Sequence, residues 1–418
     1  MLLYIIYLLL SPFFWLILLL SSLFNYKVRH NFFHSKSTIK LAEKKRIKTS
    51  KTVLLFHAAS AGEFEQLKPI LAEIDRTKYF IIQSFTSPTI YSKEKNNNII
   101  DVVCYQPFDL IWLSYIYFKA INPHKYIITR HDIWPTHLFI THKMKIDTYL
   151  INGNIHKNSI WMKPLLKSLS SKIFNFFNLI VVPSESIKKN IETFNLYNKV
   201  EVLQDSRFKQ IINRYKKNND LELLPISFLD SKNLIFGSID QEDEKNIFEA
   251  LKIIYPDGDK ALKKHNIKLI IVPHEINNKK LKEMANWLIL NNFNYTLYST
   301  IKNHNINISN VLIVDIVGIL ADLYKYSSVA YIGGGFSRGV HSVIEPAVYN
   351  NFIGFGPNIE MLDEAKELVN KKLANKVNNV SELCDFMNLI KNKNQKSDTK
   401  SFIFKSNNIN DFIKLILQ

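Results

Sequence analysis

A strand that runs into a helix through a turn of small residues decides the fold of this chain. Residues 52–74 read TVLLFHAASAGEFEQLKPILAEI. The stretch from Thr52 to His57 reads as a buried strand, β-branched or apolar up to its final histidine, and a helical pattern follows from Glu63 to Ile74. Only small residues link the two, from Ala58 to Gly62. This unit is typical of α/β proteins with a parallel sheet.

The same alternation of strand and helix recurs along the body of the chain. Further strand-like runs lie at 80–85, 99–105, 126–129, 148–152 and 179–183, and then at 234–239, 268–273, 311–314 and 329–333. Helical patterns lie between them, such as 186–193, for which Ser184 is the expected N-cap. Alternating elements imply parallel sheets with right-handed crossovers. We therefore predict an α/β chain of two Rossmann-like domains that face each other across a cleft, with ligands at the carboxyl ends of the strands.

Composition sets the domain boundaries and limits the class of protein. The 418 residues, 47% of them hydrophobic, suffice for two cores and exclude a disordered or fibrous chain. We predict an anchor over 1–26, a first domain over 27–215 and a second over 216–418, with the polar stretch 209–224 as linker. We also expect the last helix to pack back on the first domain. The two cysteines, Cys104 and Cys384, exclude a disulfide framework and a cysteine-type zinc site.

The net charge of +17 suits anionic partners such as nucleic acid, a phosphorylated substrate or a membrane surface. Charge alone suggests nucleic acid, and no basic-aromatic RNA motif or DNA-reading element accompanies it, so we expect no nucleic-acid partner. Residues 1–26 carry no charged side chain, and residues 2–24 are almost wholly apolar. About 20 apolar residues span a bilayer core, whereas a cleaved signal peptide has a positive start and a shorter apolar run.

We therefore predict an N-terminal membrane anchor helix, which Pro12 could break so that it enters only one leaflet. Basic residues follow directly, beginning with Lys27 and Arg29. By the positive-inside rule they place the body of the chain in the cytoplasm.

The turn after the first strand is the first candidate site. Ser60 and Gly62 lie where backbone N–H groups could face an anion, and Glu63 could remove a proton from an attacking hydroxyl. Ser60-x-x-Glu63 is also the pattern of a capping box, in which both side chains serve only the helix. The small residues favour a ligand because they clear space beside the backbone.

Two further turns follow strands in the first half. Asp132, in HDIWP, could orient an acceptor hydroxyl or offset positive charge, or it could be an N-cap before Trp134-Pro135. Arg207, in DSRF, could hold a phosphate by a bidentate fork, or it could form a surface ion pair with a nearby acid.

A glycine loop marks the second half. Residues 331–347 read YIGGGFSRGVHSVIEPA, in which a strand enters the loop and a helix is expected to begin near Ser342. Gly334, Gly335 and the helix N-terminus could expose N–H groups to phosphate, and Glu345 could accept ribose hydroxyls. The alternative is a second capping box, Ser342-x-x-Glu345. No Gly-Lys-Ser/Thr follows, so the loop is not a P-loop.

The motifs in this order resemble the Kdo transferases, a family of GT-B glycosyltransferases of lipopolysaccharide assembly. The resemblance covers nearly the whole chain. It rests on the apolar N-terminus and on residues 57–63, 86–89, 105–109, 132–135, 152–155 with Ser159, 182–184, 205–208, 272–274, 333–345 and 355–357. It implies transfer of Kdo from CMP-Kdo to a lipid A precursor like lipid IVA, at the inner membrane, without a metal or other cofactor.

The resemblance also implies a role for individual residues. Glu63 matches the general base of an inverting transfer, and Asp132 and Arg207 match positions that stabilise the transition state. The positions that match CMP contacts are Pro273, His274, Val317, Gly318, Ile319, Ser342, Val343, Ile344 and Glu345. The remaining candidates belong to the loops around phosphate or sugar and are Ser60, Gly62, Gly334, Gly335 and His341.

The chain departs from the usual residues of the family at several positions. The family usually has Glu at Asp132, Asn at Ser342 and Arg at Asn154, often has Lys at Arg207, and in many members has Arg at His274. Charge type is retained at Glu63, Asp132 and Arg207, so we expect activity, and Arg130 and Arg338 could supply missing positive charge. The alternatives are another GT-B enzyme with a different sugar nucleotide and a non-catalytic binding protein of the envelope.

Overall fold

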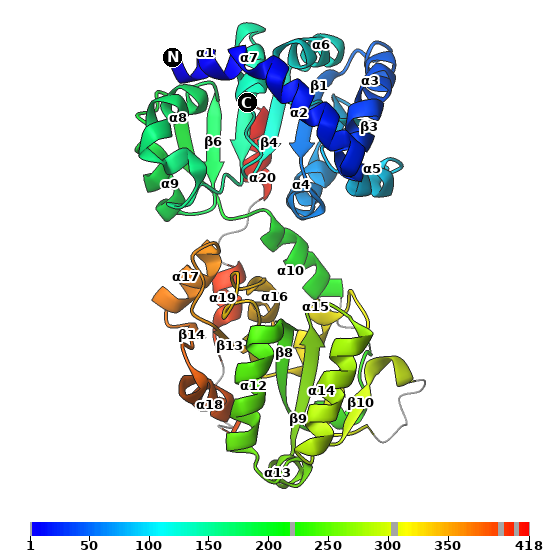
Figure 1. The fold of residues 1–418 in the computed structure, drawn as a ribbon, viewed down its shortest axis with the longest axis vertical. Helices are drawn as coiled ribbons and strands as arrows, with labels where there is room; N and C mark the ends of the chain where they lie inside the picture. The colour runs from blue at the N-terminus through cyan, green and yellow to red at the C-terminus, as the bar shows by residue number, and fades with distance from the viewer. Residues whose placement is uncertain (1, 218–221, 302–307, 392–396, 405–408, 418) are drawn as a thin grey trace. The chain divides into compact units, whose positions relative to one another are not determined.

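The chain folds into two compact units (Figure 1). The computed structural model describes residues 2–217, 222–301, 308–391, 397–404 and 409–417. The first unit comprises the chain up to Gln210 together with the C-terminal helix, and the second begins at Ile211. The division falls inside helix α10 (Arg207–Lys217). The division lies within the stretch 209–224 that we predicted as linker, and residues 209–217 of that stretch form part of this helix.

The first unit is built on a seven-stranded sheet in the order β3-β2-β1-β4-β5-β6-β7, with every pair of neighbours parallel. The strands are β1 (Thr52–Ala58), β2 (Tyr79–Phe85), β3 (Val102–Tyr105), β4 (Lys125–Thr129), β5 (Asp147–Ile151), β6 (Leu179–Val182) and β7 (Lys199–Val202). The order reverses between β1 and β4, so the loops after these two strands diverge and leave room for a ligand.

Helices cover both faces of this sheet, and a buried apolar cluster lies on each face. After the N-terminal α1 (Leu2–Leu9), α2 (Ser11–Phe24) and α3 (Tyr26–Arg46) come α4 (Ala61–Glu73), α5 (Pro88–Glu94), α6 (Ile111–Ile121), α7 (Pro135–Lys143), α8 (Lys167–Phe174) and α9 (Glu185–Glu192). The Ser184 side chain accepts from the Ile187 N–H, which confirms it as the N-cap of α9.

The last helix, α20 (Ile409–Leu417), belongs to the first unit and packs on α4 (Figure 1). Its apolar face joins the core through Ile409, Phe412 and Ile416. Lys125 Nζ donates to the Ile416 carbonyl at 2.8 Å, which satisfies one of the free carbonyls at the end of this helix.

The second unit holds a seven-stranded parallel sheet in the order β10-β11-β9-β8-β12-β13-β14. The strands are β8 (Lys232–Ile239), β9 (Ile267–Pro273), β10 (Tyr295–Leu297), β11 (Val311–Ile313), β12 (Val329–Ile332), β13 (Phe352–Phe355) and β14 (Ala374–Lys376). The order reverses between β8 and β12. The two parallel sheets confirm the α/β prediction, and the predicted cleft between the domains stays a prediction.

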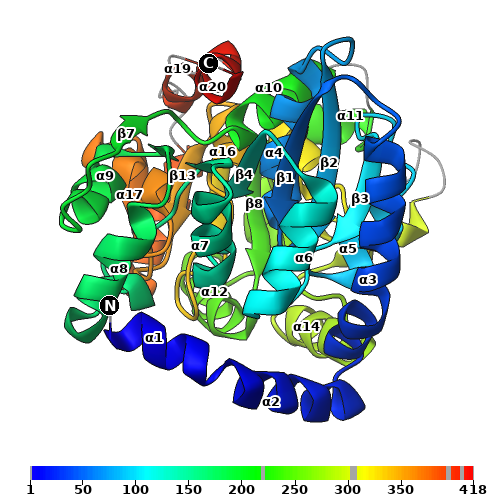
Figure 2. The same ribbon diagram turned by 90° about the horizontal axis from the view of Figure 1, so that it is seen from above.

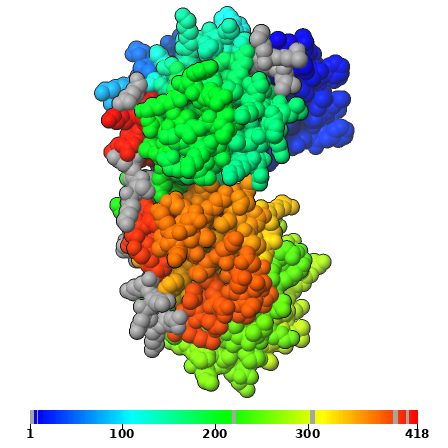
Figure 3. Space-filling model, turned by 90° about the vertical axis from the view of Figure 1, so that its left-hand side faces the viewer, coloured from blue at the N-terminus to red at the C-terminus, as the bar shows by residue number. Residues whose placement is uncertain are grey.

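Short helices are common in the second unit. They are α11 (Ile226–Leu229), α12 (Gln241–Ile254), α13 (Asp259–His265), α14 (Asn278–Leu290), α15 (Leu320–Leu323), α16 (Ile344–Ala347), α17 (Asp363–Asn370), α18 (Val380–Asn388) and α19 (Thr399–Phe404). On the face of the molecule in Figure 3, the orange and red-orange residues around α17 and α18 form a continuous surface over this unit.

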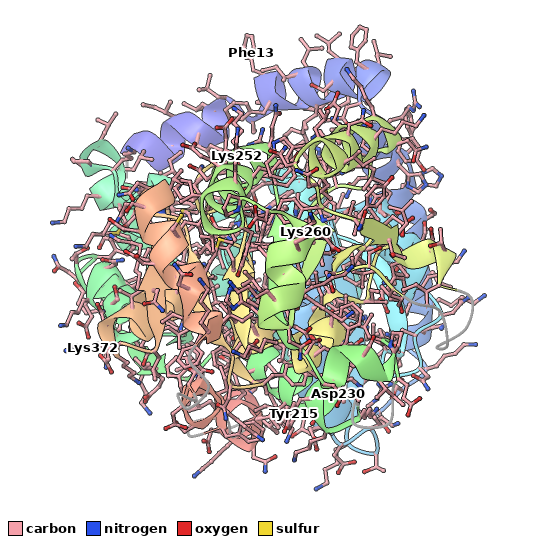
Figure 4. All side chains as sticks on the ribbon, turned by 90° about the horizontal axis from the view of Figure 1, so that it is seen from below. Phe13, Tyr215, Asp230, Lys252, Lys260 and Lys372 are labelled. Atoms are coloured by element: carbon pink, nitrogen blue, oxygen red, sulfur yellow. The ribbon has the colours of Figure 1, made fainter. Side chains whose placement is uncertain are left out.

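The N-terminal segment differs from the single anchor helix that we predicted. The chain breaks between α1 and α2 beside Pro12, and α2 and α3 meet at 117° around Asn25. Among the described residues, no individual helix combines the length and apolar character needed to cross a membrane, although the bent pair α2 and α3 passes that test together. Viewed from above, α1 and α2 run along the surface of the first unit (Figure 2). Phe13 points away from the body (Figure 4) and is 67% exposed.

Candidate active site

Glu63 occupies the third position of α4, directly after the turn that follows β1. The capping box is formed: the Ser60 hydroxyl accepts from the Glu63 N–H, and Glu63 Oε2 accepts from the N–H groups of Ala59 at 2.6 Å and Ser60 at 3.2 Å. The side chain is 5% exposed, and its Oε1 lies 4.0 Å from His131 Nε2. One carboxylate oxygen therefore serves the helix, while the other is directed toward the turn after β4.

Asp132 lies in that turn and is not an N-cap. Helix α7 begins at Pro135, and its N-cap residue is Trp134, with no side-chain hydrogen bond. Asp132 Oδ2 lies 2.7 Å from His57 Nε2, and Oδ1 accepts from Trp134 Nε1 at 2.7 Å. Burial acts to raise the pKa of Asp132, but the hydrogen bond and charge of His57, aided by Trp134 and His131, hold it below its ordinary value.

Arg207 begins α10 and pairs with Asp205. Its Nε and a terminal nitrogen lie 3.1 and 3.0 Å from Asp205 Oδ2, so the predicted ion pair with a nearby acid is present. Asp205 is buried and also accepts from Gln66 Nε2 at 2.8 Å. The pair is therefore tied to α4, and the Arg207 side chain, 23% exposed, keeps part of its surface in solvent.

The three predicted catalytic residues thus share the carboxyl edge of the first sheet. Glu63 follows β1, Asp132 follows β4 and Arg207 follows β7, and the strand register sets His57 beside Ile128. A Cβ built on Gly62 would meet no atom within 4 Å, so the backbone beside Glu63 borders open space.

The glycine loop after β12 uses its backbone differently from our prediction. The Gly334 N–H donates to Asp243 Oδ2 at 2.6 Å rather than to solvent. Other N–H groups of this loop also donate within the protein, namely those of Gly333, Ser337, Gly339, Val340 and His341. A Cβ on Gly335 would come within 2.5 Å of the Gly356 backbone, so this glycine is required by close packing of two chain segments.

The helix after this loop is a single turn and begins later than we predicted. Helix α16 starts at Ile344, and its N-cap residue, Val343, makes no side-chain cap. The capping box of Ser342 and Glu345 is therefore not formed. The side chains of Val343 and Ile344 are buried in the core, so only their backbone is available to a ligand.

A cavity of 820 Å³ opens at the carboxyl ends of β8, β9 and β12. Four of the predicted residues line it, namely Pro273, His274, Gly334 and His341. Asp240, Ser337, Arg338 and Gly339 line it as well, and it continues along the groove between α12 and α14. It lies at the switch point of the second sheet, where ligands bind in this class of fold.

Two histidines stack inside this cavity. The rings of His274 and His341 lie 4.3 Å apart between centroids and are inclined by 10°. His274 Nδ1 is 2.9 Å from the Ser238 hydroxyl. Burial lowers the pKa of His341, and the charge of His274 lowers it further, although Asp240 acts in the opposite direction. A bound phosphate would favour protonation of the His341 ring.

The predicted contacts at Val317, Gly318 and Ile319 form a second group, organised by Arg214. Arg214 Nε donates to Asp322 Oδ1 at 2.8 Å, and a terminal nitrogen donates to the Gly318 carbonyl at 3.0 Å. Gly318 has φ of 93°, and Val317 is 82% exposed. Arg214 lies in the stretch that we predicted as linker, so sequence analysis missed it.

Asp243 is the second residue that sequence analysis missed. It is fully buried on α12 below the glycine loop, where it accepts from Gly334 N–H and, at 2.9 Å, from the Tyr331 hydroxyl. Burial raises its pKa to about 6 despite these hydrogen bonds. A carboxyl group that lies 91 residues before Gly334 in the sequence gives no local signal of this contact. Within the described ranges, no three His, Cys, Asp or Glu side chains gather closely enough to hold a metal ion.

Comparisons with known proteins show what this chain is similar to. The family model described as 3-deoxy-D-manno-octulosonic-acid transferase (kdotransferase) matches residues 31–210, which contain Glu63, Asp132 and Arg207. A 3-deoxy-D-manno-octulosonic acid transferase from Aquifex aeolicus is 28% identical over 344 residues, or 81% of this chain and 86% of the relative. The enzyme of the same name from Chlamydia muridarum is 25% identical over 79% of this chain and 76% of the relative.

The chain is thus similar to Kdo transferases over its first domain and, at lower identity, over most of its length. Solved structures show the fold at much lower identity. A UDP-GlcNAc 2-epimerase from Neisseria meningitidis superposes with a TM-score of 0.60 at 14% identity, covering 88% of this chain and 99% of that one. A glycosyltransferase from Rickettsia africae gives 0.57 at 12% identity, covering 88% and 100%. Both units of this chain therefore have the GT-B type of α/β fold.

Proposed function

We propose that this glycosyltransferase transfers Kdo from CMP-Kdo to a lipid A precursor similar to lipid IVA, in the assembly of lipopolysaccharide. The observation that carries the proposal is the family match over the domain that holds Glu63, Asp132 and Arg207. The relatives named above are Kdo transferases. The donor site is assigned to the second unit and the acceptor site to the first.

In the proposed reaction Glu63 is the general base. Its Oε1, on the side of His131, takes the proton of the acceptor hydroxyl, whose oxygen bonds to the anomeric carbon of Kdo. The bond from that carbon to the CMP phosphate oxygen breaks, and CMP leaves on the opposite face with inversion. The electron pair stays on the phosphate. Oε2 keeps its two backbone hydrogen bonds, which hold the carboxylate in one orientation.

Asp132 and Arg207 supply charge in this proposal. The Asp132 carboxylate, ionised because its pKa is low, stabilises positive charge that develops on the sugar ring. The Arg207 guanidinium, held by Asp205, stabilises negative charge on the donor. Both side chains are partly exposed, so they are available to a substrate.

The proposed donor site lies at the carboxyl edge of the second sheet. Arg338, His274 and His341 line the cavity there and are suited to an anionic phosphate or carboxylate. The loop at Gly318 and the turn at Glu345 are the proposed contacts of the nucleoside.

We also propose that the body is held on the cytoplasmic face of the inner membrane by its N-terminal helices. Large apolar side chains of α1 and α2 are exposed, among them Leu9, Phe13, Ile17, Leu20 and Leu23. The opposite face packs on the domain: the Tyr7 hydroxyl donates to Asp109 Oδ2 at 2.7 Å, and the rings of Trp15 and Phe32 are in contact. An apolar face outside and a packed face inside favour an arrangement in the plane of the bilayer surface.

The basic residues of α3 favour binding to anionic lipids. Each Lys or Arg close to the membrane surface contributes about 1 kcal/mol to the binding free energy. Flotation with vesicles that contain anionic phospholipid tests this part. A Phe13→Asp, Leu20→Asp variant is expected to remain unbound, and equal flotation of the variant and the natural protein would refute the proposed surface.

The decisive experiment for the activity is a transfer assay read by mass spectrometry. Purified protein receives CMP-Kdo, generated in the reaction mixture, and a tetra-acylated lipid A precursor. A gain of one or more Kdo masses is expected and counts the transfers. No gain with CMP bound would identify a different acceptor, and neither gain nor CMP binding would identify a different donor or a non-catalytic protein.

A further inference from the structure

A buried histidine connects the first two strands of the site to Asp132. His57 is the penultimate residue of β1 and is fully buried. The parallel register sets it directly beside Ser84 of β2, and its Nδ1 lies 2.9 Å from the Ser84 hydroxyl. Its Nε2 lies 2.7 Å from Asp132 Oδ2. The imidazole therefore bridges a strand and the catalytic turn.

The chemistry of the partners fixes the direction of the short hydrogen bond. The Asp132 carboxylate is ionised at neutral pH and can only accept, so the proton lies on His57 Nε2. Ser84 also lies 3.1 Å from the Phe56 carbonyl. Its single hydroxyl proton goes either to that carbonyl or to His57 Nδ1, and in both cases Nε2 remains the donor toward Asp132.

We infer that His57 is the positioning residue of Asp132: its buried imidazole holds the carboxylate in one orientation at the mouth of the site. This inference rests on the proposed function, in which Asp132 acts on the sugar. The second oxygen of Asp132 is held by Trp134, so the carboxylate is clamped from both sides while 22% of the side chain stays exposed. His57 itself touches no substrate, because it has no exposed surface.

The pKa of Asp132 depends on the charged groups around it, so a change in this pKa can measure the contribution of His57. The titratable groups that act on Asp132 or on its neighbours are His57 on β1, His131 in the same turn, Tyr126 on β4, Asp109 and, beside His131, Glu63. Among these titratable groups, only His57 is hydrogen-bonded to Asp132 within the described residues, and Trp134, which does not titrate, makes the second hydrogen bond. Removal of His57 leaves a half-buried carboxylate with Trp134 alone, so the pKa of Asp132 rises.

Two substitutions separate the hydrogen bond from the volume of the ring. In His57→Gln the amide nitrogen reaches the position of Nε2 and can still donate to Asp132. In His57→Asn the amide nitrogen corresponds to Nδ1, faces Ser84 and falls short of Asp132. His137→Asn is the matched control, because His137 is another fully buried histidine of this domain, 2.8 Å from the carboxylate of Asp109.

The first readout does not depend on activity. The full-length protein is labelled with ¹³C at aspartate carboxyl groups, and the signal of Asp132 is assigned with Asp132→Asn. The pKa of Asp132 is expected to be low in the natural protein, in His57→Gln and in His137→Asn, and to rise by about one pH unit or more in His57→Asn. An unmoved pKa in His57→Asn would overturn the inference, whether or not the protein transfers Kdo.

The second readout is turnover in the transfer assay. His57→Asn is expected to lower kcat by about 10- to 100-fold, to move the acid limb of the pH profile upward and to leave the affinity for CMP unchanged. His57→Gln is expected to restore most of the loss. In an Asp132→Asn background, His57→Asn is expected to add almost no further loss. Additive losses with an unmoved acid limb would show a purely structural role and would overturn the inference.

Discussion

At the carboxyl edge of the first sheet, charged side chains are held by hydrogen bonds and ion pairs with other side chains. At the carboxyl edge of the second sheet, backbone hydrogen bonds hold the glycine loop, and a cavity lies beside it. Asp132 is held by His57 and Trp134, and Arg207 is held by Asp205. In the second unit the N–H groups of the glycine loop donate to backbone carbonyls and to Asp243.

The same topological position therefore carries two kinds of preorganisation. Paired side chains hold charge in place for chemistry, as proposed for the first unit. A folded loop shapes a concave surface for a ligand, as proposed for the second. Mutations that remove a charged side chain should therefore affect mainly the first edge. Mutations that fill space beside the backbone should affect mainly the second edge.

The largest effect is expected from Glu63→Gln. The amide oxygen can still accept from Ala59 and Ser60, so the cap on α4 and the unfolding temperature are retained. Loss of the base lowers turnover by about 10²- to 10⁴-fold. The transfer assay and CMP titration measure the two effects. Unchanged turnover would remove Glu63 from the role of base, and weaker CMP binding would show that the two edges are not independent.

Glycine-to-alanine substitutions test whether the backbone is more closely packed in the glycine loop of the second unit than in the turn before α4. In Gly335→Ala the new methyl group meets the backbone of Gly356 at 2.5 Å, so the second unit is expected to lose about 3 kcal/mol of stability. In the matched variant Gly62→Ala the methyl group enters open space at the start of α4. The first unit should therefore gain about 0.5 kcal/mol in its free energy of unfolding. Urea unfolding of the full chain measures both, and equal effects would contradict the contrast.

Asp243→Asn tests the buried carboxyl below the glycine loop. Burial raises the pKa of Asp243 to about 6, so folding favours its protonated form. Its contribution to stability is fully present below the ordinary pKa of 3.8 and is lost as pH rises through about 6. The stability of the variant relative to the natural protein should therefore increase between pH 4 and pH 6, by about 2 to 3 kcal/mol.

Unfolding in urea at several pH values measures this difference. Asp240→Asn is the comparison, because the hydrogen bonds of Asp240 outweigh its burial and lower its pKa instead. A constant difference between Asp243→Asn and the natural protein across this range would contradict the assignment.

The smallest effect on substrate binding or turnover is expected from Arg214→Ala. Loss of the hydrogen bond to the Gly318 carbonyl frees the exposed loop that is proposed to contact the nucleoside. Affinity for CMP should fall about tenfold, the value of one charge-assisted hydrogen bond. Arg214→Lys keeps the charge but not the bidentate fork to Asp322 and should recover only part of the affinity. Full affinity in Arg214→Ala would exclude the loop from the donor site.

Much of the first unit is predictable from sequence because its strands are long, apolar and followed by small residues. The strands around residues 52, 80, 126 and 148 lie where the pattern predicts them. The short strands β10, β13 and β14 were missed, since each has only three or four residues and includes a threonine, a glycine or an asparagine, whereas the equally short β11 and β12 contain no such residue. The helix near Ser342 was placed two residues early, because glycine and serine signal a helix start that the packed loop does not use.

The same limit applies within the site. Glu63, Asp132 and Arg207 are visible as charged residues after strands, and the choice between cap and ligand at each required coordinates. In the structure the capping box at Glu63 is present, whereas Asp132 and Ser342 are not helix caps. Several residues of the two sites have hydrogen-bond partners far away in the sequence, so no local pattern reveals these contacts. They are His57, Gln66, Arg214 and Asp243.

By itself the sequence determined the α/β class, the parallel sheets and the strand ends at which charged and glycine-rich turns appear. These follow from hydrophobic periodicity and from the conformational demands of short turns, which are local properties. Only the tertiary structure decided which carboxylates are paired, which glycines pack and which N–H groups stay available. Those outcomes depend on strand register and on burial, which bring together residues separated by tens of positions and set their electrostatics.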